Sequence, residues 1–99
     1  MAPGKAKLIL VRGEGLEGLS YHLNATEHIA GRQKGEILFP EDSYLSPEHA
    51  AFFYRDNQLY IQDRSSQNGT FVGIDDTIEL TDGSECIVGD QMFRIEYLD

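Results

Sequence analysis

Arg32 follows a glycine and carries a side chain well suited to binding a phosphate group. Its planar guanidinium offers a fork of N–H donors that matches phosphate oxygens better than a lysine ammonium does. Gly31 lets the backbone turn tightly just before it. The alternative is a surface arginine paired with one of the 17 Asp and Glu residues of the chain. Taken alone, the Gly-Arg pair favours that alternative.

A second group of polar residues is the segment Ser46-Pro47-Glu48-His49. The Ser46 hydroxyl can donate a hydrogen bond to an anion, and Pro47 stiffens the loop. The His49 ring can bond to the loop backbone and hold it in place. The alternative makes Ser46 a helix-cap or turn residue and His49 the first residue of a strand.

A third polar segment runs from Asp63 to Thr70 and contains the turn dipeptide Asn68-Gly69. The side chains of Asp63, Ser65 and Ser66 can bond to nearby backbone and order this loop. A plain hairpin turn explains the glycine, but it does not explain so many polar side chains around it.

The elements that must position these loops are strands. Apolar and polar residues alternate with a period of two, which indicates strands with one buried face. A continuous apolar run at residues 8–11 predicts a strand covered on both faces. Turn signals at Asp56-Asn57, Asp82-Gly83 and Gly89-Asp90 separate the later strands. The alternating segments are residues 20–24, 59–62, 77–81 and 93–97.

Many short strands predict an all-β fold, an antiparallel sandwich or barrel, in which function lies on loops at one end. The long loops at residues 31–47 and 63–70 are therefore the candidate site.

Composition limits the possible partners. The 99 residues carry a formal net charge of −9, which argues against nucleic acids and anionic membranes as partners. The single cysteine, Cys86, cannot form an intrachain disulfide and is expected in the core. No signal peptide or apolar stretch of membrane-spanning length is present, so we expect a cytoplasmic protein. We expect residues 1–7 to be a flexible lead, and the chain to be part of a longer protein.

In this order and strand context, the three segments resemble the forkhead-associated (FHA) domain family. That family's pattern is Gly-Arg, Ser-x-x-His and Asn-Gly-Thr, followed by a glycine-containing hairpin before the last strand. The resemblance covers residues 8–98 and implies a β-sandwich of two twisted sheets, about eleven strands in all, with the binding loops at one end. The run from Phe39 to Pro47 resembles bacterial sequences.

The resemblance implies a phosphothreonine-binding interaction module of a signalling protein that catalyses nothing. Arg32 and Ser46 would contact the phosphate, and Asn68 would hold the peptide main chain, with Gln67 and Ser66 beside it. The residues that shape the loops would be Gly31, His49, Gly69 and Thr70. The expected partner is a phosphothreonine-containing protein or peptide, with no cofactor and no metal, and the isolated domain is expected to be monomeric.

Two positions depart from the family's pattern. Pro47 stands where a further phosphate donor is common, and proline has neither a side-chain donor nor a backbone N–H. Gln67 stands where Thr or Ser is common. Losing one charge-assisted bond of roughly 1.5–3 kcal/mol weakens binding about tenfold to hundredfold. Ser65, Ser66 and Arg64 are candidates to replace the missing donor. The alternative function is phosphate-independent protein binding or self-association.

Other functions fit the sequence poorly. Residues 13–18 match G-x-G-x-x-G, but a strand pattern follows where a dinucleotide site needs a helix. A Ser46, His49 and Asp63 triad would place nucleophile and base in poor geometry. The possible metal ligands lack the usual spacing: His22, His28, His49 and Cys86.

Overall fold

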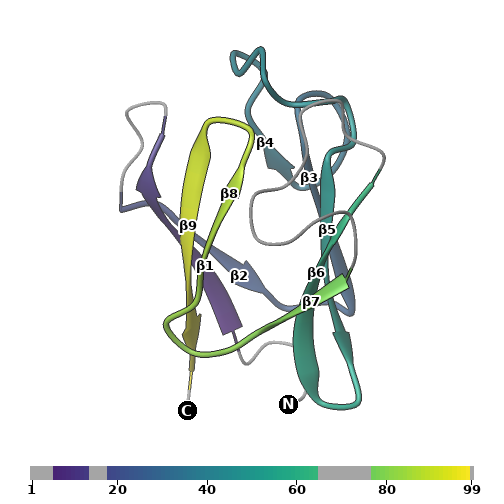
Figure 1. The fold of residues 1–99 in the computed structure, drawn as a ribbon, viewed down its shortest axis with the longest axis vertical. Coiled ribbons are helices and arrows are strands. Elements are labelled where there is room, and N and C mark those ends of the chain that lie inside the picture. Colours follow the sequence, from purple (N-terminus) through teal and green to yellow (C-terminus); the bar gives the residue numbers. More distant parts are fainter. Residues whose placement is uncertain (1–5, 14–17, 65–76, 99) are drawn as a thin grey trace.

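The computed structural model describes residues 6–13, 18–64 and 77–98. These residues form nine strands and no helix (Figure 1). The strands are β1 (Ala6–Arg12), β2 (Ser20–Leu23), β3 (Glu27–Gly31), β4 (Ile37–Leu38), β5 (Ala50–Arg55), β6 (Gln58–Asp63), β7 (Thr77–Leu80), β8 (Glu85–Val88) and β9 (Gln91–Tyr97).

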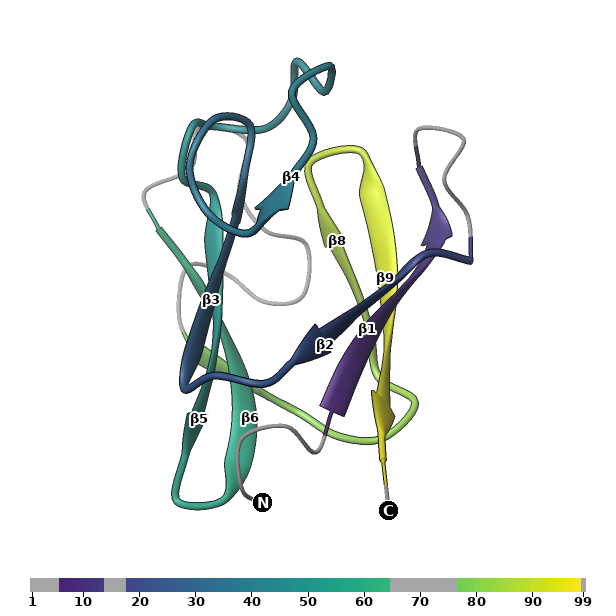
Figure 2. The ribbon, with the colours of Figure 1, turned by 180° about the vertical axis from the view of Figure 1, so that it is seen from behind.

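The strands form two sheets that face each other (Figures 1 and 2). One sheet has the order β2-β1-β9-β8, and the other has the order β4-β3-β5-β6-β7. Neighbouring strands are antiparallel except for the short β3–β4 pair. The predicted all-β sandwich of two sheets is thus confirmed. Of the roughly eleven strands that the resemblance implied, nine lie in the described residues.

Local turn chemistry explains the hairpins. Asp56 and Asn57 join β5 to β6 with φ angles of 54° and 64°, a left-handed conformation that short polar side chains tolerate. The turn between β8 and β9 pairs Val88 with Gln91, and Gly89 has a φ of 62°. Both turns lie where the sequence predicted them.

Alternation along each strand separates the core from the surface. In β9, Gln91, Phe93 and Ile95 are buried, while the residues between them are half-buried. Strand β1 follows the same alternation, so Ile9 and Val11 are half-buried. The prediction that β1 is covered on both faces was wrong, because within the described part of the chain no second layer packs on the outside of its sheet. The continuous apolar run overstated the burial.

Phe93 lies at the centre of the core. Its ring contacts Phe39, Phe52 and Tyr21, with centroids 6.0, 6.4 and 6.2 Å away. These residues come from both sheets and from the segment that follows β4. Phe39 therefore anchors the start of the loop that leads to Ser46.

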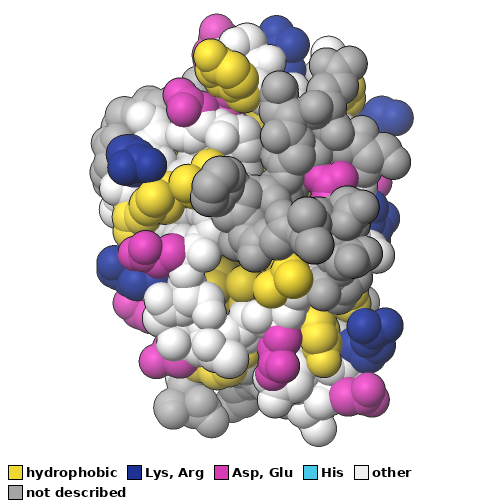
Figure 3. All heavy atoms as spheres, viewed as in Figure 1, with side chains coloured by type: hydrophobic (Ala, Val, Ile, Leu, Met, Phe, Trp, Pro, Cys, Tyr) yellow, Lys and Arg dark blue, Asp and Glu magenta, His cyan; other side chains and the backbone are white. Residues whose placement is uncertain are grey.

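Charged side chains are spread over the surface. Figure 3 shows acidic side chains scattered across one face, with basic ones between them. Among the described residues, no helix is long and apolar enough to cross a membrane, and no group of His, Cys, Asp and Glu could hold a metal ion.

Strand β1 starts at Ala6. The last two residues of the segment expected as a flexible lead, residues 1–7, therefore pair with β9.

Cys86 is buried in β8, as predicted, and burial raises the pKa of its thiol to about 12. The thiol is therefore protonated at any pH at which the protein would be handled. We predict that native protein does not react with a thiol reagent at about pH 8, because only the thiolate attacks and the side chain is inaccessible. The same assay in concentrated guanidinium chloride should label Cys86 fully. Rapid labelling of the native protein would show that β8 opens readily from the sheet.

Candidate functional site

The end of β3 and the segment before β5 bring Arg32 and Ser46 together. The Arg32 backbone N–H donates to the Ser46 carbonyl at 3.0 Å. Beyond them, Ala30 pairs with Ala50 in the β3–β5 ladder, and the His49 N–H donates to the Ala30 carbonyl at 2.9 Å. Strand pairing thus delivers two residues that are 14 positions apart in the sequence to one place.

Pro47 serves as an acceptor in this contact. The backbone N–H groups of Gln33 and Lys34 both donate to the Pro47 carbonyl, at 3.2 and 2.9 Å. Gly31 lies so close that a Cβ built on it would come within 2.3 Å of the Pro47 oxygen. Glycine is needed at position 31 for this close approach, because the atoms that a side chain would meet belong to rigid backbone.

His49 holds the loop from inside. It is fully buried, and its Nδ1 accepts a hydrogen bond from the Ser46 backbone N–H at 3.1 Å. In the neutral ring the proton therefore lies on Nε2. The His49 carbonyl accepts the Arg64 N–H at 2.9 Å, which attaches the end of β6 to the same loop. His49 thus organises the backbone around Ser46.

The Arg32 side chain is exposed at this loop end of the sandwich. Its Nε lies 3.4 Å from the Pro40 carbonyl, a long hydrogen bond. Arg32 forms no ion pair with any carboxylate in the described part of the chain, although acidic residues outnumber basic ones. This removes the simple alternative of a surface arginine paired with one of the described carboxylates. The guanidinium is placed to accept an anionic ligand.

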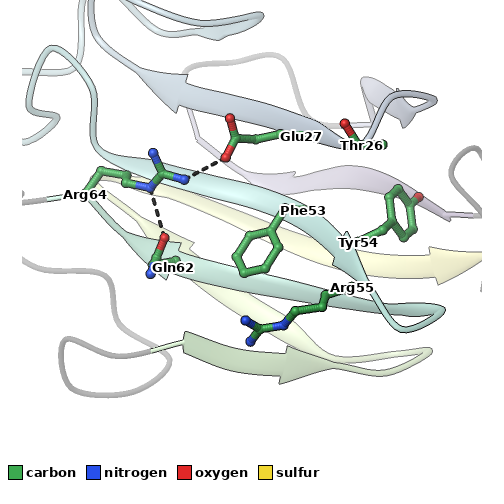
Figure 4. Close-up of a pocket in the computed structure, with 7 residues that line it drawn as sticks. All are labelled: Thr26, Glu27, Phe53, Tyr54, Arg55, Gln62 and Arg64. Carbon is green, nitrogen blue, oxygen red and sulfur yellow. Dashed lines mark hydrogen bonds and ion pairs between the residues drawn. The ribbon is translucent and has the colours of Figure 1, made fainter.

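Arg64 is directed elsewhere. Its guanidinium donates to Glu27 Oε2 at 2.6 Å and to Gln62 Oε1 at 3.1 Å (Figure 4). It also lies 3.8 Å from Glu48 Oε2. These partners hold it on the outer face of the five-stranded sheet. Arg64 is therefore a poorer candidate to replace the donor missing at Pro47.

Most of the third predicted segment, residues 65–70, lies outside the described residues, which stop at Arg64 and resume at Thr77. This applies to Ser66, Gln67, Asn68, Gly69 and Thr70, so their predicted roles stay predictions.

The structure also shows two features that the sequence did not point to. One is a shallow groove of about 490 Å³ on the outer face of β3, β5 and β6, lined by Thr26, Glu27, Phe53, Tyr54, Arg55, Gln62 and Arg64 (Figure 4). Arg55 lies over the stacked rings of Phe53 and Tyr60 there.

The other is Asp42, a buried carboxylate in the loop before Ser46. Two of its partners, Asp90 and Gln91, lie 48 and 49 residues away. No local pattern in a single sequence links them.

Comparison with known proteins agrees with this geometry. A family model described as the FHA domain matches residues 28–89, more than half of the chain. The glycogen accumulation regulator GarA of Mycobacterium tuberculosis H37Rv is 32% identical over 100 residues, which cover 99% of this chain and 60% of that protein. GarA of Mycolicibacterium smegmatis is 31% identical over 97 residues, which cover 96% of this chain and 60% of that protein. The chain thus spans about 60% of the length of these curated relatives.

Solved structures share the fold. The FHA domain of an Arabidopsis thaliana hypothetical protein aligns with a TM-score of 0.84 at 22% identity, over 99% of this chain and 88% of that one. EmbR of Mycobacterium tuberculosis, in complex with a low-affinity phosphopeptide, aligns with a TM-score of 0.82 at 22% identity, over 96% of this chain and 25% of that one.

The close approach at Gly31 generates a prediction. We expect Gly31→Ala to lower the free energy of unfolding by about 1–3 kcal/mol, because the added methyl forces residues 31–34 away from Pro47. Chemical denaturation measures the change. Lys34→Ala is the matched control, since it keeps the backbone N–H and should shift stability by no more than about 0.5 kcal/mol. Equal stability of Gly31→Ala and wild type would show that the contact relaxes freely.

Proposed function

Because this chain belongs to the FHA domain family, we propose that it is a non-catalytic interaction module that binds phosphothreonine in a partner protein. The observation that carries the proposal is the pairing of Arg32 with Ser46 at the loop end of the sandwich, held by the 3.0 Å backbone hydrogen bond. The backbone bond makes an arginine without a described carboxylate partner and a serine neighbours, and their side chains could offer a phosphate both charge and donors.

The two side chains would divide the work. Arg32 would bind two phosphate oxygens with its guanidinium, and the Ser46 hydroxyl would donate to a third. By family resemblance, Asn68 would hold the peptide main chain, with Gln67 and Ser66 nearby. Pro47 supplies no donor to the ligand, since proline has neither a backbone N–H nor a side-chain donor, and its carbonyl accepts the N–H groups of Gln33 and Lys34. Binding to phosphate would therefore depend more heavily on Arg32 and Ser46.

Side chains around the phosphate site are candidates to read the residues that follow the phosphothreonine. Gln33, Lys34 and Tyr44 are exposed on the same loops. Arg64 is a poorer candidate, because Glu27 and Gln62 hold its guanidinium on the outer sheet face.

We propose no catalysis at this site. The buried His49 uses Nδ1 to accept the Ser46 backbone N–H, which is an architectural role. A nucleophilic serine would need an unprotonated ring nitrogen as a base for its hydroxyl, and in the neutral ring the only such nitrogen, Nδ1, already accepts the Ser46 backbone N–H.

A cytoplasmic, monomeric domain is part of the same proposal. The single cysteine is free and buried, as is usual for proteins of a reducing compartment. The large exposed apolar side chains of the described residues are scattered in the sequence: Leu19, Leu38, Tyr44 and Leu98. The chain aligns with 60% of the length of a relative named as a regulator. This supports the proposal that the domain belongs to a regulatory protein.

Titration of a phosphothreonine peptide against its unphosphorylated twin tests the function. We expect binding of the phosphorylated peptide only. Arg32→Ala should weaken it by at least about a hundredfold, because two charge-assisted bonds of roughly 1.5–3 kcal/mol each are lost. The melting temperature should stay close to that of wild type, since the side chain is exposed. Equal affinity for the two peptides would support phosphate-independent binding instead.

Binding should also depend on pH. A phosphothreonine takes up its second proton near pH 6 and loses part of its charge below that value. We therefore expect affinity to fall as the pH is lowered from about 7 to about 5, with a plateau above neutral pH. Calorimetry at several pH values measures this, and circular dichroism at each pH checks that the protein stays folded. A flat profile would argue against a dianionic ligand.

A further inference from the structure

Asp42 is a carboxylate that is only 4% exposed, and no described cation pairs with it. Buried carboxylates are rare unless they are paired or hydrogen-bonded. Asp42 is satisfied by three donors. Its Oδ2 accepts the Asp90 backbone N–H at 2.7 Å and Gln91 Nε2 at 2.9 Å, and its Oδ1 accepts the Tyr44 backbone N–H at 2.9 Å.

The two bonds to Oδ2 join the two sheets at the loop end. Asp42 belongs to the connection between β4 and β5. Asp90 lies in the turn between β8 and β9 of the opposite sheet, and Gln91 is the first residue of β9. Figures 1 and 2 show the two segments at the same end of the sandwich. The packing is close, because a Cβ on Gly89 would lie 2.7 Å from Asp42 Oδ2 and from the Leu45 side chain. The turn therefore supports the loop through direct contact.

The same connection carries Ser46. The Asp42 N–H donates to the Phe39 carbonyl at 3.1 Å, and the Leu45 N–H donates to the Asp42 carbonyl at 3.2 Å. Leu45 is buried, and Ser46 follows it directly. Ser46 is thus held on one side by His49 and Arg32, and on the other by the turn built around Asp42.

We propose that Asp42 is a positioning residue for the phosphate site. By tying the loop to the β8–β9 turn, it keeps Ser46 beside Arg32 before any ligand arrives, so that binding does not have to order the loop. The role rests on the proposed function, since it concerns phosphopeptide affinity. Asp42 itself, being buried, would not touch the ligand.

Asp42→Asn tests the role, because it keeps the shape of the side chain but replaces one acceptor oxygen with a donor. We expect phosphopeptide affinity to fall about tenfold or more, since the loop must then be ordered during binding. The probe is a phosphothreonine peptide selected on wild-type protein from an oriented library. Calorimetry is run well below the melting temperature of every variant.

Two further variants separate positioning from stability. Ile95→Ala removes a buried side chain from the later part of β9, so it should lower the melting temperature and change affinity by less than about twofold. Gln91→Met removes one of the two groups that donate to Asp42 Oδ2, at nearly constant volume. Its loss of affinity should therefore lie between that of Ile95→Ala and that of Asp42→Asn. If Asp42→Asn fails to fold, Gln91→Met is compared with Ile95→Ala instead. A larger loss of affinity in Gln91→Met supports the positioning role, and an equal loss in the two variants overturns it.

Amide NMR spectra of the ligand-free variants provide a readout independent of binding. Asp42→Asn should shift the Ser46 and Arg32 amide resonances, and Ile95→Ala should leave them in place. A folded Asp42→Asn with wild-type affinity, or an equal loss of affinity in Ile95→Ala, overturns the positioning role. If wild-type protein binds no phosphothreonine peptide, the proposed function fails first, and this role fails with it.

Discussion

The backbone contact between residues 31–34 and residues 46–47 decides where the candidate phosphate-binding residues lie. Three N–H groups of the first segment donate to the Ser46 and Pro47 carbonyls, and Gly31 permits the close approach. The antiparallel register of β3 with β5 delivers both segments to this point. Arg32 and Ser46 are neighbours because of that pairing, and the rest of the site is arranged around it.

Pro47 shows how one residue can serve the scaffold rather than the ligand. Proline cannot donate from its backbone, but its carbonyl remains a strong acceptor, and here it receives two N–H groups. The same atom limits what can stand at position 31, because a methyl there would collide with it. Proline at position 47 therefore both accepts the bonds of the tight loop and leaves that position without a donor for a ligand.

The second sheet supports this site through apolar and polar contacts. The rings of Phe39 and Phe93 lie 6.0 Å apart and anchor the start of the loop in the core. Farther along, Asp42 accepts donors from the β8–β9 turn. Apolar burial is tolerant of direction, whereas hydrogen bonds are directional. The buried Phe39 therefore anchors the loop on the core, and the hydrogen bonds of Asp42 fix its orientation.

The sequence by itself determined the all-β class and the turns at Asp56-Asn57 and Gly89-Asp90, because side-chain alternation and turn chemistry are local properties. It also pointed to Arg32 and Ser46 through the ordered motifs. Only the tertiary structure decided that Arg64 faces Glu27 and that Asp42 meets Gln91. Those partners lie 37 and 49 residues away, and no periodicity in the chain records which distant donors a buried or half-buried charge will find.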